Sequence, residues 1–195
     1  MKRLGHLAII AHDMGLIFEF LALITLVPII VLILFREWEM IIPMGAVPFI
    51  FIVTGLLISR VPKKAYTPSL SVALVAVALT WLAIAAVGAV PFVLALDLSW
   101  TDSIFESMSG WTGTGFTMMT SLDTMPKTLI FWRSFMQWVG GIGVIAFGIA
   151  MLSRSGLTQI QLYRSEGRSE ELMPSVVSTG RRMWAIYVFL TVVFT

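Results

Sequence analysis

Long apolar runs separated by short polar turns dominate this chain of 195 residues. The runs cover about Met14–Phe35, Met40–Ser59, Ser69–Val90 and Lys127–Leu152. Each approaches or exceeds the roughly 20 residues that a helix needs to cross the apolar core of a bilayer. The pattern therefore predicts an all-α integral membrane protein.

Local signals refine the ends of these spans. Asp13 is a candidate N-cap for the first span, Pro28 is expected to kink it, and Pro91 is expected to end the third span. Glu19 lies within the first span, where a carboxylate is costly. Two interpretations stay open for it. Either it faces a neighbouring helix or snorkels toward the interface, or it takes part in ion conduction.

A polar, glycine-rich pentapeptide, Thr112–Phe116 (TGTGF), interrupts the apolar sequence between the third and fourth spans. Ser99 followed by Asp102 resembles a capping box and predicts a helix over about Trp100–Gly110. A helix of that length measures roughly 16 Å, about half the apolar thickness of a bilayer. Non-helical backbone at bilayer depth is tolerated only where protein buries it or where it lines a water-filled path. We therefore expect a re-entrant half-helix followed by an extended strand, whereas the pentapeptide alone would also suit an ordinary loop.

This arrangement suggests how the half-helix and the pentapeptide could bind a cation. The C-terminal end of a half-helix carries partial negative charge, which favours a cation near the bilayer centre. An extended strand with glycine at alternate residues, where φ is positive, can turn successive carbonyls toward one axis and replace the hydration shell of a potassium ion. The candidate potassium-binding backbone consists of Thr112, Gly113, Thr114, Gly115 and Phe116. One such segment provides one wall of a pore, and the same unit is found in potassium channels.

Arg133 is the basic residue expected inside the fourth span, about two turns from its start. Snorkelling to lipid headgroups is one explanation for it. The other is that Arg133 pairs with Glu106 or Asp123 and supports the pore loop. Both explanations remain open at the level of sequence.

Charge sets the expected orientation. Basic residues are enriched on the cytoplasmic side of membrane proteins, and alternating the spans places ten of the thirteen basic residues on the side of the N-terminus. The N-terminus is therefore predicted to be cytoplasmic, and the half-helix is predicted to enter from outside. The carboxylates then expected at or near the external face are Glu37, Glu39, Asp97, Asp102, Glu106 and Asp123.

Composition excludes several classes of protein. Hydrophobic residues make up 58% of the chain and charged residues only 12%, with a mean hydropathy of +0.93, whereas soluble domains carry about a quarter charged residues. The chain has no cysteine, so no thiolate metal site is expected, and no basic-aromatic tract indicates nucleic acid. An intramembrane serine protease would need a base near Ser107 or Ser109, but the two histidines, His6 and His12, lie at the cytoplasmic end. We therefore expect the protein to have no enzymatic activity and to bind no cofactor.

Four regions are predicted along the chain. They are an N-terminal pair of transmembrane helices (1–68), a membrane–pore–membrane repeat (69–152), a cytoplasmic linker (153–182) and the start of a further helix (183–195). The last apolar run is too short to span a bilayer. We therefore expect the sequence to be part of a longer protein.

Three stretches resemble a known family. The first stretch, Phe105–Ile145, is similar to the first pore loop and following helix of the Trk/Ktr/HKT superfamily. The similarity lies in its two segments FESMSGWTGTGFT and LDTMPKTLIFWRSFMQWVGGIGVI. Within that superfamily it is most similar to the Trk-type potassium uptake membrane subunit. Gln161–Glu166 and Trp184–Tyr187 are similar to the linker and next helix of that subunit.

The resemblance implies a potassium-uptake pore in the plasma membrane. It implies four membrane–pore–membrane repeats per complete chain, a homodimer with a pore in each chain, and a cytosolic nucleotide-binding regulatory subunit. Gly115 occupies the filter glycine of the family, whereas family members more often have threonine where Gly113 stands. The gating element of the family would lie beyond Thr195. The alternative is a non-conducting structural or assembly protein, or an inactive fragment of the transporter.

Overall fold

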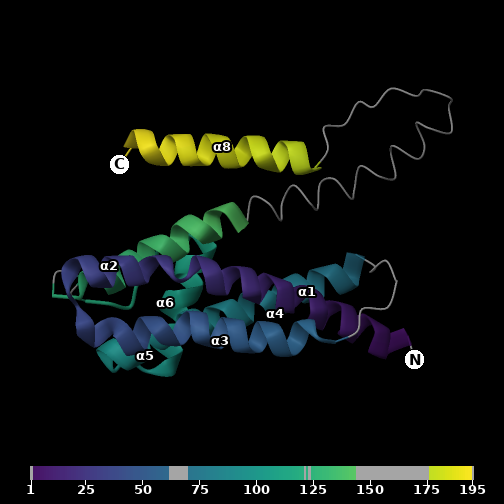
Figure 1. The fold of residues 1–195 in the computed structure, drawn as a ribbon, viewed down its shortest axis with the longest axis horizontal. Helices are drawn as coiled ribbons and strands as arrows, with labels where there is room; N and C mark the ends of the chain where they lie inside the picture. The colour runs from purple at the N-terminus through teal and green to yellow at the C-terminus, as the bar shows by residue number, and fades with distance from the viewer. Residues whose placement is uncertain (1, 62–69, 121, 123, 144–175, 195) are drawn as a thin grey trace. The chain divides into compact units, whose positions relative to one another are not determined.

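The computed structural model describes residues 2–61, 70–120, 122, 124–143 and 176–194. Within these ranges the regular secondary structure is helical, and no β-strand is present (Figure 1). Among the residues that the structure describes, three helical segments are long and apolar enough to cross a membrane, namely Ile10–Phe35, Trp38–Ser59 and Ser71–Leu96. The prediction of an all-α membrane fold is confirmed at this level. The chain divides into two compact units, Met1–Gln137 and Trp138–Thr195.

The first span consists of two helices, α1 (Lys2–Ile24) and α2 (Val27–Phe35). The kink expected at Pro28 is present as a break at residues 25–26. Pro28 itself lies in the first turn of α2, where a missing N–H removes no helical hydrogen bond. The expectation for Asp13 is wrong, because α1 begins at Lys2 and continues through this residue.

The second span, α3 (Ile41–Ser59), follows a short 3-10 turn, η1 (Trp38–Met40), and lies beside α1 (Figure 1). Small residues allow this close approach, since a Cβ added at Gly55 would lie 2.9 Å from the Cγ of Glu19. The Oε1 of Glu19 accepts a hydrogen bond from the hydroxyl of Ser59 at 2.6 Å. The interpretation that Glu19 faces a neighbouring helix is therefore confirmed.

The third span continues past the residue at which it was expected to end. Helix α4 (Leu70–Gly88) is followed after Ala89 by α5 (Val90–Leu96), whose first turn contains Pro91. Proline is tolerated there because the first N–H groups of a helix have no helical partner. The span ends at Asp97, whose φ of 52° lies in the left-handed region typical of helix C-termini.

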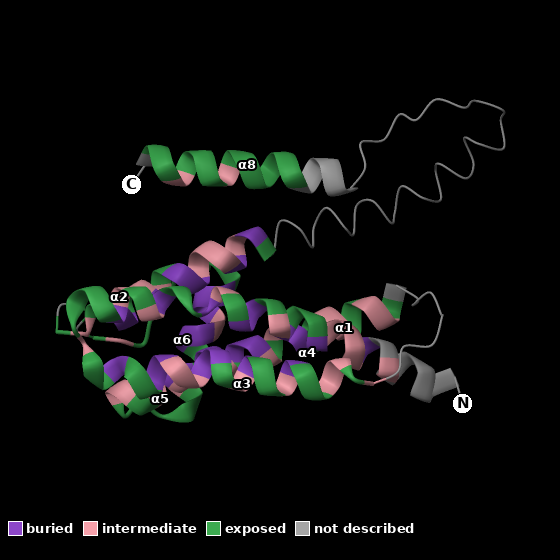
Figure 2. Cartoon of the chain, in the orientation of Figure 1, coloured by how far each residue is buried: buried purple, intermediate pink, exposed green. Residues whose placement is uncertain are grey.

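Helix α6 (Trp100–Thr112) contacts α4 and α5 and contributes to the core of the first unit. Figure 2 shows buried residues on α6 and on the helices around it, while α1, α2 and α3 expose large apolar side chains. The largest fully buried side chains include Trp111, Trp132 and Phe51. Trp111 and Trp132 meet edge to face, with ring centroids 6.1 Å apart. Exposed apolar surface of this kind suits helices that are surrounded by lipid hydrocarbon.

The fourth predicted span is described as a helix over 127–143, and its remainder, 144–152, lies outside the described residues. In the second unit, α8 (Val176–Phe194) includes Met183, near which the next helix was expected to start. The predicted boundaries at residues 68 and 152 also lie outside the described residues.

Candidate functional site

Helix α6 begins where the sequence predicts and carries its own cap. The Oγ of Ser99 accepts a hydrogen bond from the N–H of Asp102 at 3.1 Å and donates one to its Oδ2 at 2.7 Å, so the expected cap is confirmed. The helix has 13 residues. It is therefore about 20 Å long, against roughly 30 Å for the apolar core of a bilayer. Although α6 continues to Thr112 rather than stopping at Gly110, it remains too short to span a membrane.

The chain leaves α6 through two glycines in the left-handed region, Gly113 with φ 71° and Gly115 with φ 77°. The N–H of Gly113 donates to the carbonyl of Gly110 at 3.0 Å, and the N–H of Thr114 donates to the carbonyl of Ser109 at 3.1 Å. This Schellman-type end satisfies carbonyls of the last turn. The expectation that alternate residues have positive φ is confirmed for Gly113 and Gly115.

The five candidate filter residues do not form one extended strand, which corrects the prediction. Thr112 is the last residue of α6, and residues 113–119 have no regular secondary structure. The segment is exposed, yet it is fixed to the helix, because the Oγ of Ser109 donates a hydrogen bond to the carbonyl of Phe116 at 2.7 Å. The backbone turns at the glycines instead of extending, since the left-handed conformation bends the chain.

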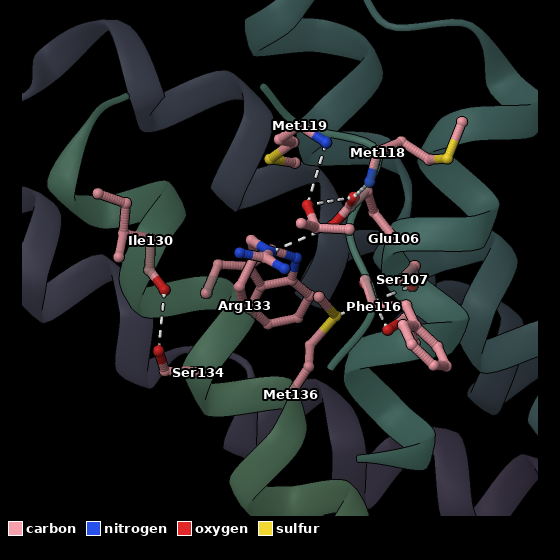
Figure 3. Close-up of polar contacts among 12 residues, drawn as sticks. Glu106, Ser107, Phe116, Met118, Met119, Ile130, Arg133, Ser134 and Met136 are labelled. Atoms are coloured by element: carbon pink, nitrogen blue, oxygen red, sulfur yellow. Dashed lines mark hydrogen bonds and ion pairs between the residues drawn. The ribbon is translucent and has the colours of Figure 1, made fainter. Parts of the chain in front are cut away.

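Glu106 holds the far end of this segment. Its side chain is buried, and its Oε1 accepts hydrogen bonds from the hydroxyl of Thr117 at 2.7 Å and from the N–H of Met118 (Figure 3). Its Oε2 lies 3.1 Å from the Nε of Arg133. A buried carboxylate needs such partners to compensate for its lost hydration. The structure therefore pairs Arg133 with Glu106, whereas Asp123, the other expected partner, lies outside the described residues.

Close contacts fix α6 against its neighbours. A Cβ added at Gly88 would lie 2.4 Å from the Oγ of Ser107 and 2.6 Å from the Nε1 of Trp111. The Nε1 of Trp132 donates a hydrogen bond to the carbonyl of Gly88 at 3.1 Å. The hydroxyl of Ser107 also contacts the sulfur of Met136 at 3.8 Å (Figure 3). The end of α6 thus lies at a fixed position between α4 and the helix 127–143.

Sequence reasoning missed one residue that acts on this site. The Oε1 of Glu37 accepts a hydrogen bond from the N–H of Lys127 at 2.8 Å, and its Oε2 accepts one from the N–H of Thr128 at 2.9 Å. Pro126, which precedes the helix 127–143, has no side-chain acceptor for these N–H groups. Glu37 therefore serves as the cap from a distant part of the chain. The missing local cap was the signal in the sequence that a partner had to come from elsewhere.

The environment of Glu37 favours its ionised form. Burial alone would raise the pKa of its carboxyl group. Hydrogen bonds from Thr128 and Lys127, together with the positive charge of Lys127, outweigh burial and lower the pKa from the ordinary value of 4.5.

The exposed segment offers a cation backbone carbonyl groups and threonine hydroxyl groups. Such oxygen atoms can replace the hydration shell of a potassium ion. Among the residues that the structure describes, His, Cys, Asp and Glu side chains form no group of three or more that could hold a metal ion.

Comparisons with known proteins identify relatives over much of the chain. Residues 39–195 match the family described as TrkH, cation transport protein. An uncharacterized cation transporter of Methanocaldococcus jannaschii is 37% identical over 190 residues, which cover 94% of this chain and 38% of that protein.

Two relatives from Escherichia coli strain K12 also match. The Trk system potassium uptake protein TrkH is 39% identical over 122 residues, covering 60% of this chain and 25% of that protein. The Trk system potassium uptake protein TrkG is 24% identical over 192 residues, covering 95% of this chain and 40% of that protein. The chain thus spans less than half the length of these relatives.

Proposed function

Since the chain belongs to the TrkH cation transport family, we propose that it forms part of a pore through which potassium ions enter the cell. Transporters of this family are not enzymes. In this proposal α6 is a re-entrant half-helix, and the segment after it lines one wall of a potassium filter. The filter backbone comprises Thr112, Gly113, Thr114, Gly115 and Phe116, and its supporting side chains are Glu106, Arg133 and Asp123.

The observation that carries this proposal is how an exposed loop is held at both ends by buried groups. At its beginning, the N–H groups of Gly113 and Thr114 donate to carbonyls of the last turn of α6. Further along, Ser109 holds the carbonyl of Phe116, and Glu106 holds Thr117 and Met118. A loop fixed in this way presents its other carbonyl groups at defined positions, while the carbonyl of Phe116 accepts the hydrogen bond from Ser109. A filter needs such positions, because its carbonyl groups must replace water around the ion.

Transport on this basis involves no covalent chemistry. The C-terminal end of α6 carries partial negative charge, which favours a cation next to Gly113. The membrane potential supplies the driving force, about 2.3 kcal/mol for each charge moved through 100 mV. Potassium is the proposed ion because potassium uptake is in the names of the TrkH and TrkG relatives.

The orientation and the partners are also part of the proposal. The excess of basic residues on one side supports a multi-pass protein of the plasma membrane with a cytoplasmic N-terminus. The family resemblance supports a homodimer of the complete chain and a cytosolic nucleotide-binding regulatory subunit. Membrane lipid surrounds the exposed apolar faces of α1, α2 and α3.

The test is uptake of rubidium, as a tracer for potassium, by a bacterial strain that lacks its own potassium-uptake systems. The complete reading frame is expected to restore uptake, and Gly115→Asp, which places a charge in the filter, is expected to abolish it at equal surface amount. A protein that reaches the membrane but gives no uptake in either form would contradict the proposal. That outcome would favour a structural or assembly role.

A further inference from the structure

We propose that Glu37 is a positioning residue for the filter, acting through the helix 127–143 and its Arg133. This inference deepens the proposed function and rests on it. Glu37 does not touch the candidate filter residues themselves. It holds the start of the helix whose arginine pairs with the carboxylate that supports the filter loop.

The contact of Glu37 with the helix is bidentate. Its two carboxylate oxygens accept hydrogen bonds from the first two N–H groups of the helix, those of Lys127 and Thr128. Such bonds are charge-assisted, and a negative charge at a helix N-terminus is favoured by the helix dipole. Glu37 precedes Lys127 by 90 positions. The contact therefore ties the turn between the first two spans to the helix that follows the filter.

A second contact acts at the same place. The Nζ of Lys127 lies 4.5 Å from the centroid of the Phe35 ring, a distance at which a cation and an aromatic ring attract each other. The last residue of α2, Phe35, and the turn after it, through Glu37, thus both contact the start of the helix. Two separate contacts restrict both the translation and the rotation of the helix end.

The helix 127–143 connects this fixed start to the filter loop through Arg133. Arg133 lies six positions after Lys127, about 9 Å further along the helix axis. Its Nε is 3.1 Å from the Oε2 of Glu106, and the Oε1 of the same carboxylate holds Thr117 and Met118. A shift of the helix start would lengthen the ion pair and release the far end of the filter loop.

The first experiment compares Glu37→Gln with Glu39→Gln in the complete transporter, with surface amount measured in each case. Glu39 is an exposed carboxylate of the same turn and is the matched control. Glu37→Gln is expected to raise the half-saturating rubidium concentration roughly 3- to 10-fold, whereas Glu39→Gln leaves it unchanged. Glu37→Asp, which keeps the charge, should recover part of the affinity.

A double-mutant cycle distinguishes positioning from general stabilisation. If Glu37 acts through Arg133, Glu37→Gln adds little to the loss of affinity in an Arg133→Lys background. Full additivity of the two losses would overturn the inference. An unchanged half-saturating concentration in Glu37→Gln would overturn it as well.

A thiol reporter tests the positioning independently of transport. The given sequence has no cysteine, so Met118→Cys introduces a reactive thiol at the end of the filter loop. With an impermeant thiol reagent, its modification in the Glu37→Gln background is expected to be roughly 3-fold faster or more, as local opening increases. Equal rates in the Glu37→Gln and Glu39→Gln backgrounds would overturn the inference. A faster rate in a protein that shows no uptake would contradict the proposed function alone.

Discussion

The Nε of Arg133 lies 3.1 Å from the Oε2 of Glu106 and joins the helix 127–143 to α6. The side chain of Glu106 is 0% exposed and that of Arg133 is 14% exposed. The pair is therefore largely desolvated. Its geometry matters because either partner left alone would be an uncompensated buried charge.

Arg133→Gln is expected to destabilise the protein by about 3–5 kcal/mol, because it leaves the carboxylate of Glu106 buried and unpaired. Adding Glu106→Gln should recover part of this loss. Thermal unfolding of the purified protein measures both effects, with Arg182→Gln, an exposed position on α8, as the control. A double variant that is less stable than Arg133→Gln would contradict the importance of this ion pair.

Thr117→Val keeps the shape of the side chain but removes the hydroxyl that donates to Glu106. A hydrogen bond to a charged group contributes about 1.5–3 kcal/mol, so weaker rubidium binding is expected. Competition between rubidium and sodium during uptake is the measurement. Thr120→Val, at an exposed threonine of the same segment, is the control and should behave as the parent protein. Equal behaviour of the two variants would show that this hydrogen bond does not matter for ion selection by the proposed filter.

Gly113 is expected to tolerate asparagine better than valine. Its φ of 71° is left-handed, and a Cβ at this position would meet no atom within 4 Å. The cost of substitution is therefore conformational, roughly 1–2 kcal/mol and lowest for asparagine among non-glycine residues. Rubidium affinity and thermal stability should fall in the order glycine, asparagine, valine. A valine variant equal to the parent would show that the left-handed turn is not required.

Gly88→Ala and Gly45→Ala form a matched pair on two helices. A Cβ at Gly88 would lie 2.4 Å from the Oγ of Ser107, whereas a Cβ at Gly45 would meet nothing within 4 Å. Gly88→Ala should lower the free energy of unfolding by about 1–3 kcal/mol through overpacking. Gly45→Ala should raise it by roughly 0.5–1 kcal/mol through helix propensity. Chemical denaturation in detergent measures both, and equal effects would contradict the close contact between α4 and α6.

Protonation of Glu37 should weaken the link between the turn after α2 and the helix 127–143. Because its pKa lies below the ordinary value of 4.5 in the folded state, its contribution to stability is fully present above that value. The contribution is lost as the pH falls through the folded pKa. The stability difference between the parent and Glu37→Gln should therefore be constant near neutral pH and shrink below pH 4.5. Melting temperatures measured across this range test the prediction, and a difference that does not change with pH would contradict it.

The amino-acid sequence determined the features that depend on local chemistry. Apolar run length is sufficient to predict the first three spans, because a segment of about 20 apolar residues is stable across a bilayer. Ser99 predicted the start of α6, since its hydroxyl can accept a hydrogen bond from one of the first N–H groups of a helix, which have no helical partner. Gly113 and Gly115 predicted the left-handed turns, because they lack a Cβ.

Which side chains and helices contact one another depends on the tertiary structure and could not be predicted from the sequence. From the sequence, Glu106 and Asp123 were both possible partners of Arg133. The sequence could not distinguish them, because an ion pair depends on the position and rotation of the two helices relative to each other. Pro91 suggested an end to the third span, yet the helix resumed as α5, where proline fits the first turn. Glu37 caps a helix that begins 90 positions later. The sequence shows that the first N–H groups of this helix lack a local acceptor, but it does not identify the acceptor. Only the folded chain brings Glu37 next to these N–H groups.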